Sequence, residues 1–249
     1  MARMRARLPG HQKHKAEQRR EMMPIQDQGF HGDRYLIALF EALSGSVENF
    51  VETGSEAGTT ICYVATNYPN INVFSCEADP AIYEVVLHNL KGHPNVSLAC
   101  ERSPDFLYRL HQQVPSLSSS LSVYFLDAHG YGFRWPLKQE VRFLTNTLEK
   151  GIILVDDMKV PDHPEFGYDR YDYQECSLEF LGSSIARGKT YTVCFPDYTE
   201  HTSSYHPLRG YGVIAFGDER AENILLHQTN FRSQQIRRGL LRTLVRVDA

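Results

Sequence analysis

Long apolar segments and paired cysteines are both missing from this chain of 249 residues. No stretch approaches the roughly 20 consecutive apolar residues that a membrane-spanning helix needs, so we expect no membrane partner. The five cysteines are an odd number and include no Cys-x-x-Cys pair, which is typical of buried free thiols in a reducing compartment. The basic beginning of the chain also lacks the apolar core of a secretory signal. Together these absences predict a cytoplasmic protein.

Charge is unevenly distributed along the chain. The formal net charge is −4, yet arginine and lysine crowd residues 1–20, and residues 232–246 are also basic. We interpret residues 1–24 as a disordered basic tail, with a transit peptide or a nucleic-acid-binding arm as the alternatives. We do not expect nucleic acid as a partner, because no cluster of base-stacking aromatic residues accompanies the arginines.

A glycine turn is the most informative local pattern. Residues 49–60 read Asn-Phe-Val-Glu-Thr-Gly-Ser-Glu-Ala-Gly-Thr-Thr, which predicts a buried strand, a turn and a helix start. Gly54 can adopt a positive φ and let a ligand approach the backbone, and Gly58 can let the helix pack closely on the strand. Free N–H groups at the helix start would face that ligand. The fingerprint of nicotinamide-dependent oxidoreductases needs a middle glycine where Glu56 stands, and two glycines alone could also form an ordinary turn.

Strand-like and helix-like segments alternate along the rest of the chain. Asp33 and Asp79-Pro80 have the composition of helix starts, and short apolar runs before and after them have the composition of strands. The alternation predicts an α/β fold: a doubly wound, mostly parallel, seven-stranded sheet with an antiparallel hairpin at its edge. That hairpin would pair residues 191–195 with 212–216. We expect one domain over 25–216 and a C-terminal extension over 217–249, read as an amphipathic helix that docks on the domain or pairs subunits in a homodimer.

Acidic residues follow most of the predicted parallel strands, namely Glu52, Glu77, Asp127, Asp156 and Asp157. Ligands of doubly wound sheets bind beyond the carboxyl ends of the strands. Carboxylates crowded there repel one another, so a cationic ligand, a metal ion or both would stabilise them. Glu77 lies 77 − 54 = 23 residues after Gly54. An acid at that spacing can accept hydrogen bonds from both hydroxyls of a ribose, although it could also be a solvated strand cap.

These motifs, in this order, resemble those of the class I S-adenosylmethionine-dependent methyltransferases over about residues 30–216. The segments that carry the resemblance are 51–58 (Val-Glu-Thr-Gly-Ser-Glu-Ala-Gly), 74–79 (Phe-Ser-Cys-Glu-Ala-Asp), 124–129 (Tyr-Phe-Leu-Asp-Ala-His) and 153–157 (Ile-Leu-Val-Asp-Asp). The resemblance implies a Rossmann-like methyltransferase fold. It also implies that Glu52, Gly54 and Gly58 hold the methionine part of S-adenosylmethionine, that Glu77 holds its ribose, and that Ser103 lies near its adenine. The complete cofactor site that we predict consists of Glu52, Gly54, Ser55, Gly58, Thr59, Glu77, Ala78, Ser103 and Asp127.

The ends of the fourth and fifth predicted strands are similar to those of metal-dependent O-methyltransferases of the catechol and macrolide-sugar types. The resemblance implies Mg²⁺ bound by Asp127, Asp156 and Asp157, and three clustered carboxylates are also suitable ligands for such an ion. The alternative is that Asp156 and Asp157 only cap a loop. The chain departs from the catechol type in having Asp157 where asparagine is usual. It also has His129-Gly130 where a catalytic lysine might be expected.

His129 is the candidate general base, because it lies two residues after Asp127 and histidine titrates near neutral pH. The alternative is a histidine that only packs or caps. Tyr131, Phe133 and Trp135 could line an acceptor pocket or belong to the core. Residues 159–171, a long aromatic and polar loop, are expected to form a lid or part of the acceptor site, unless they are a surface excursion.

The sequence therefore predicts an S-adenosylmethionine-dependent O-methyltransferase that acts on a hydroxyl of a small molecule or sugar, with His129 and Asp127 as catalytic residues and Mg²⁺ as a possible aid. The alternatives are a protein of the same fold that binds the cofactor without catalysis, a nicotinamide-dependent oxidoreductase and a nucleic-acid methyltransferase. The missing middle glycine argues against the oxidoreductase.

Overall fold

The computed structural model describes residues 29–129, 135–200, 208–239 and 244–246. The predicted basic tail over 1–24 and the side chains of Tyr131 and Phe133 lie outside these ranges. No helix in the described ranges is both long and apolar enough to cross a membrane.

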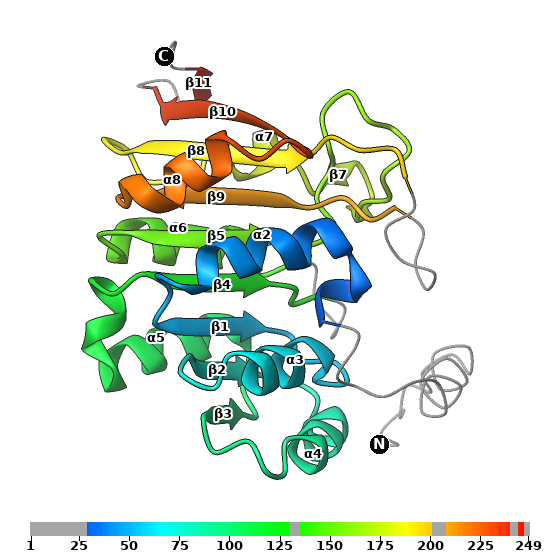
Figure 1. Cartoon of the computed structure of the whole chain (residues 1–249), viewed down its shortest axis with the longest axis vertical. Coiled ribbons are helices and arrows are strands. Elements are labelled where there is room, and N and C mark those ends of the chain that lie inside the picture. Colours follow the sequence, from blue (N-terminus) through cyan, green and yellow to red (C-terminus); the bar gives the residue numbers. More distant parts are fainter. Residues whose placement is uncertain (1–28, 130–134, 201–207, 240–243, 247–249) are drawn as a thin grey trace, which may run out of the picture.

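Helices and strands alternate as the sequence predicts (Figure 1). In chain order the elements are η2 (Gly29–Gly32), α2 (Arg34–Ser44), β1 (Asn49–Thr53), α3 (Thr59–Asn67), β2 (Asn72–Cys76), α4 (Pro80–Asn89), β3 (Val96–Ala99), α5 (Ser103–Gln113), η3 (Pro115–Ser118), β4 (Ser122–Leu126), α6 (Leu137–Thr147), β5 (Gly151–Val155), β6 (Arg170–Tyr171), β7 (Gln174–Glu175), α7 (Leu178–Gly182), β8 (Thr190–Pro196), β9 (Gly212–Phe216), α8 (Glu219–Leu226), β10 (Phe231–Arg238) and β11 (Leu244–Arg246).

The first five strands form the parallel half of the central sheet, in the order β5-β4-β1-β2-β3. Strands β1, β4 and β5 are buried over their whole length, which is why their sequences are continuous apolar runs rather than alternating patterns. Two predicted helix starts are confirmed, because Asp33 caps α2 and Asp79 caps α4 with proline next to it. The predicted α/β fold is therefore confirmed.

The other half of the sheet continues as β9-β8-β10-β11 with antiparallel pairing at every step from β5 outward. Strands β8 and β9 do pair antiparallel, but they lie inside the sheet rather than at its edge. The sheet in the described residues has nine strands, not seven, and seven of the nine run in one direction. The helix expected over 217–249 is also wrong beyond α8, because 231–238 form β10, which pairs with β8.

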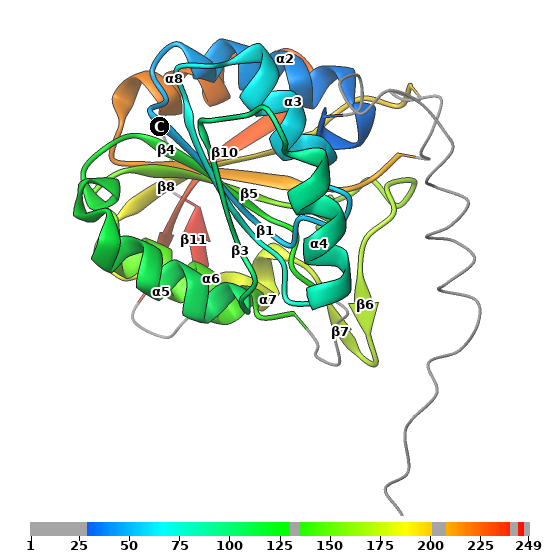
Figure 2. The same ribbon diagram turned by 90° about the horizontal axis from the view of Figure 1, so that it is seen from below.

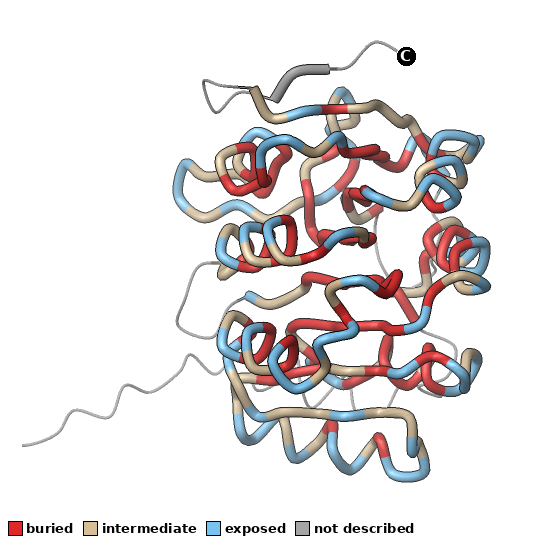
Figure 3. Tube along the Cα trace, turned by 90° about the vertical axis from the view of Figure 1, so that its left-hand side faces the viewer, coloured by how far each residue is buried: buried red, intermediate tan, exposed pale blue. Residues whose placement is uncertain are grey.

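Helices cover both faces of the sheet (Figure 2). Helices α2, α3, α4 and α8 share one buried apolar cluster with one face of the strands, and α5, α6 and α7 share another cluster with the opposite face. Figure 3 shows the same layering, with buried strands between helices whose outer surfaces are exposed. The carboxyl ends of β1, β4 and β5 point to the right in Figure 1, towards η2 and the β6–β7 hairpin.

Candidate active site

The predicted acidic residues meet at one edge of the sheet. Backbone hydrogen bonds connect neighbouring strand ends there, from Asp127 N to Thr53 O at 3.0 Å and from Asp156 N to Leu126 O at 3.1 Å. Burial raises the pKa of Asp127 well above its usual value, and repulsion from Asp156, Asp157 and Glu52 adds to this shift. Repulsion from Glu77 likewise adds to the raised pKa of Glu52. The carboxylates therefore form one interacting group, as the sequence predicted.

The glycine turn lies against the end of β4. Gly54 has a φ of +84°, and a Cβ at this position would be 2.7 Å from Asp127 O, so glycine is needed for this close approach. Gly58 has a φ of +76° and caps α3. Its missing Cβ would meet Val86 Cγ1 of α4 at 2.9 Å. The space expected for a ligand at Gly54 is thus filled by the backbone that follows β4, and the close contact at Gly58 is with α4 rather than with the strand.

Glu52 is buried beneath this turn. Its Oε2 accepts a hydrogen bond from Ser75 Oγ at 2.8 Å, and Ser55 Oγ lies 2.8 Å from Ser75 Oγ. Burial raises the pKa of Glu52 to about 8, although the Ser75 hydrogen bond opposes this shift. A buried carboxyl of this kind would favour a nearby positive charge.

Glu77 is also buried, and the backbone fixes its position. Its two carboxylate oxygens accept hydrogen bonds from Glu56 N at 3.2 Å and from Asp79 N at 2.9 Å. Burial raises its pKa, and these backbone N–H groups oppose the shift. Each oxygen keeps a second acceptor site, so two ribose hydroxyls could still bind there.

The remaining predicted cofactor residues follow the carboxyl ends of β1, β2 and β3, on both faces of the sheet. Thr59 begins α3, and Ala78 follows Glu77 directly. Ser103 begins α5 and is buried, and its hydroxyl makes no hydrogen bond to the described residues. The roles assigned to these residues stay predictions.

The three predicted metal ligands do not form one group. Asp127 and Asp156 gather with His31, whereas Asp157 gathers with His129 and Asp169. Within each group the candidate ligand atoms lie within 4.8 Å of one another. Asp157 also has a φ of +49°, a left-handed conformation that is uncommon for residues other than glycine.

His31 is the main site residue that the sequence reasoning missed. Its Nε2 lies 2.9 Å from Asp156 Oδ2 and 4.0 Å from Asp127 Oδ2. Burial alone would lower the pKa of His31, but Asp156 raises it above its ordinary value. His31 in turn lowers the pKa of Asp156 to about 2, against the effect of burial. No sequence pattern connects a histidine in η2 to the end of β5.

Arg209 was also missed. Its Nη1 lies 3.6 Å from Asp156 Oδ2 and 3.3 Å from Asp157 Oδ1. Arg209 reaches this place because the backbone at Gly210 packs directly against the loop after β5. Met158 N donates to Gly210 O at 2.8 Å. A Cβ on Gly210 would be 2.1 Å from Met158 O, so only glycine allows this contact.

A small pocket lies beside these carboxylates on the α6 side of the sheet. Residues lining the pocket are Leu126, Asp127, Ala128, His129, Trp135, Leu137, Glu140, Asp156, Asp157 and Asp169. His129 Nδ1 lies 3.3 Å from Asp169 Oδ2, and His129 Nε2 lies 3.7 Å from Asp127 Oδ1. Trp135 donates to Asp169 Oδ2 at 3.2 Å and packs edge-on against Tyr171. Asp169 and Tyr171 belong to the long loop that the sequence singled out.

Glu140 of α6 is a further buried acid that the sequence did not reveal. It is 1% exposed, and neither carboxylate oxygen makes a hydrogen bond to the described residues. Burial raises its pKa to about 7, and the nearby hydroxyls of Ser103 and Thr53 partly oppose this shift. The floor of the pocket therefore carries a buried acid beside two hydroxyls.

No protein-family model matches the sequence, and no curated protein matches it either. Solved structures do match the fold. The O-methyltransferase TomG of Streptomyces achromogenes, involved in tomaymycin synthesis and solved in complex with S-adenosylmethionine, is 15% identical, with a TM-score of 0.54 over 84% of this chain and 89% of that one. A Klebsiella pneumoniae protein provisionally assigned as an O-methyltransferase is 17% identical, with a TM-score of 0.53 over 84% and 87%. The chain therefore has the fold of the class I S-adenosylmethionine-dependent methyltransferases, as its motifs predicted.

Proposed function

We propose that the protein is an S-adenosylmethionine-dependent O-methyltransferase whose acceptor is a hydroxyl of a small molecule or sugar. The observation that carries the proposal is the meeting of Glu52, Glu77, Asp127 and Asp156 at one sheet edge, next to the glycine turn. Crowded, buried carboxylates are stabilised by positive charge, which a sulfonium cofactor supplies. The similarity to TomG, which was solved with S-adenosylmethionine, supports the same cofactor here.

In this proposal the cofactor lies across the ends of β1 and β2. The ribose hydroxyls donate to Glu77, and the sulfonium end lies towards Glu52 and Asp127. Ser55, Thr59, Ala78 and Ser103 line the rest of the site. Methyl transfer then requires the acceptor oxygen in line with the methyl group, about 3 Å away, so positioning supplies much of the rate.

His129 is the proposed general base. Asp127 and Asp169 lie on either side of its ring, at 3.7 and 3.3 Å, and can orient it towards the pocket. Asp127 and Asp156, with their oxygen donors, fit a divalent cation such as Mg²⁺, which when bound would lower the pKa of the acceptor hydroxyl. Trp135, which lines the pocket and packs against Tyr171, supplies an apolar wall that would exclude water from the acceptor.

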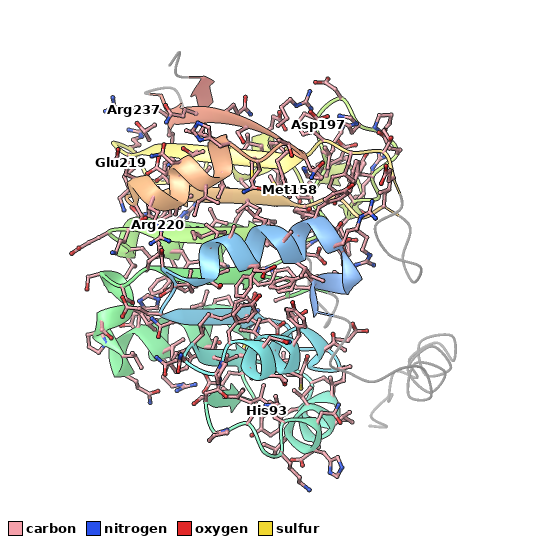
Figure 4. All side chains as sticks on the ribbon, in the orientation of Figure 1. His93, Met158, Asp197, Glu219, Arg220 and Arg237 are labelled. Atoms are coloured by element: carbon pink, nitrogen blue, oxygen red, sulfur yellow. The ribbon has the colours of Figure 1, made fainter. Side chains whose placement is uncertain are left out.

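Calorimetry with S-adenosylhomocysteine tests the cofactor. We expect a complex with one ligand per chain, and about tenfold weaker binding for Glu77→Gln, which keeps the shape of the side chain but removes one acceptor. The matched control is Glu219→Ala, an exposed acid at the end of the molecule where the strands begin (Figure 4), which should bind like the parent protein. No binding to the parent protein at millimolar ligand would refute the proposal.

Turnover separates an enzyme from a cofactor-binding protein of the same fold. Incubation with S-adenosylmethionine and a panel of hydroxylated acceptors should release S-adenosylhomocysteine, and His129→Ala should slow that release without changing S-adenosylhomocysteine affinity. Tight binding of the cofactor without turnover on any acceptor would favour the non-catalytic alternative.

A further inference from the structure

The group of His31, Asp127 and Asp156 has the spacing of metal ligands. Ligand atoms about 2.1 Å from an octahedral ion are about 3 Å apart when adjacent and about 4 Å apart when opposite. His31 Nε2 lies 2.9 Å from Asp156 Oδ2 and 4.0 Å from Asp127 Oδ2. One nitrogen and two oxygen donors thus lie within 4.8 Å of one another at the edge of the sheet.

The backbone holds His31 in this place against its own conformational preference. Phe30 and His31 have φ values of 54° and 56°, a left-handed conformation that is uncommon for residues other than glycine. Phe30 is fully buried among Phe40, Phe50 and Phe125, and its N donates to Thr60 Oγ1 at 3.3 Å. Strained residues that packing fixes in this way occur preferentially at functional sites.

Asp157 is poorly placed to complete the same group. Its candidate ligand atom gathers with those of His129 and Asp169, and Arg209 Nη1 lies 3.3 Å from its Oδ1. The Arg209 guanidinium lies nearest to Asp157 but also 3.6 Å from Asp156 Oδ2, so it supplies positive charge to both carboxylates. Asp127 has the imidazoles of His31 and His129 as its nearest ion-pair partners, at 4.0 and 3.7 Å.

We propose that His31 takes the place of Asp157 as a metal ligand, so that His31, Asp127 and Asp156 bind a divalent transition-metal ion such as Mn²⁺ or Co²⁺ rather than Mg²⁺. Imidazole nitrogen favours transition metals, whereas sites built from oxygen alone suit Mg²⁺. On binding, the ion replaces the proton between His31 Nε2 and Asp156, which leaves to solvent. The inference refines the metal of the proposed methyltransferase site.

The test measures metal binding directly, without cofactor or turnover. Protein freed of metal by a chelator is titrated with Mn²⁺, Co²⁺ and Mg²⁺, with calorimetry for all three and the electron paramagnetic resonance signal of free Mn²⁺ as a second readout. We expect one Mn²⁺ per chain, and at least about tenfold weaker Mn²⁺ binding for His31→Ala, since loss of a mere supporting group already costs about that much. The matched control is His163→Ala, a histidine that also pairs with two acids, Glu165 and Asp197.

A second variant tests selectivity. His31→Asp offers an oxygen donor and tolerates the left-handed backbone. Because most sites follow the same order of metal affinity, the informative quantity is the ratio of Co²⁺ to Mg²⁺ affinity, which should fall at least about tenfold in His31→Asp. Circular dichroism confirms that each variant is folded.

Two results would overturn the inference: no Mn²⁺ or Co²⁺ binding to the parent protein, or unchanged Mn²⁺ affinity in His31→Ala. The second result would make His31 a charge partner of Asp156 only. Both are distinguishable from failure of the proposed function, because S-adenosylhomocysteine binding is measured separately in chelator.

Discussion

Replacing Glu52 with glutamine should stabilise the protein, and increasingly so as pH rises. Glu52 is buried, and its pKa is raised from 4.5 to about 8. Glutamine has the shape of the protonated acid and can still accept the hydrogen bond from Ser75 Oγ. The variant therefore imitates the form of Glu52 that the fold prefers, without the ability to ionise.

The size of the effect follows from the two pKa values. Below pH 4.5 both folded and unfolded chains hold the proton, so the variant and the parent protein should be similarly stable. Above it, the unfolded chain releases the proton while the folded chain keeps it, and the parent protein loses about 1.4 kcal/mol of stability per pH unit. The advantage of Glu52→Gln should thus be about 2 kcal/mol at pH 6, and about 5 kcal/mol above pH 8, where it becomes constant.

Urea denaturation measures this difference. The experiment uses cofactor-free protein in chelator, because a bound cation would lower the pKa of Glu52. Trp135, the single tryptophan of the chain, provides the fluorescence signal, with circular dichroism as a second probe. Glu84→Gln on the exposed surface of α4 is the control and should show little change with pH. A difference for Glu52→Gln that stays constant or shrinks as pH rises would refute the reasoning.

Two further predictions concern the glycine turn and the thiols. Gly54→Ala should destabilise the fold by about 2–4 kcal/mol and abolish S-adenosylhomocysteine binding, because its Cβ would collide with Asp127 O and its φ is +84°. Gly45→Ala, where φ is −66° and nothing lies within 4 Å, should change stability by less than about 1 kcal/mol, and equal effects of the two substitutions in urea denaturation would contradict the assignment. In the folded protein a thiol reagent should modify Cys100 rapidly and the buried Cys62, Cys76, Cys176 and Cys194 slowly, because burial raises the pKa of these four thiols. Cys100→Ser should remove the rapid phase, and its persistence would show that the buried thiols are accessible.

Local signals explain why most of the fold could be predicted from the sequence. Strands such as β5 are continuous apolar runs, and helices such as α2 and α4 begin at a capping aspartate. The ends of these elements are therefore determined by residues adjacent in the sequence, and the sequence alone reveals them. Strand β10 is different, because its polar sequence Phe-Arg-Ser-Gln-Gln-Ile-Arg-Arg has no strand-like pattern, and pairing with the distant β8 determines its structure. Spaced leucines and arginines around it suggested a helix instead.

The candidate site also contains residues that the sequence could predict and residues that it could not. Acids at strand ends could be found because parallel strands bring their carboxyl ends together. His31 and Arg209 could not be predicted as site residues, because both belong to segments that are remote in the sequence from the strand ends. Contacts of the folded chain at Phe30 and at Gly210 bring these segments to the site. The division of Asp156 and Asp157 between two groups of candidate ligands could not be predicted either, because two adjacent aspartates do not reveal which side chains each of them meets.

The candidate site draws its side chains from opposite sides of one sheet. His31 comes from the layer of α2 and α3, whereas Glu140 and Trp135 come from the layer of α6, and the two layers have separate apolar clusters. Because substitutions in different clusters are largely additive, evolution could remodel the α6 layer for a new acceptor and leave the opposite layer intact. Under the proposed function, relatives of this protein that differ in acceptor preference should therefore differ mainly around α6 and the loop after β5, which gives protein engineers a confined region to randomise.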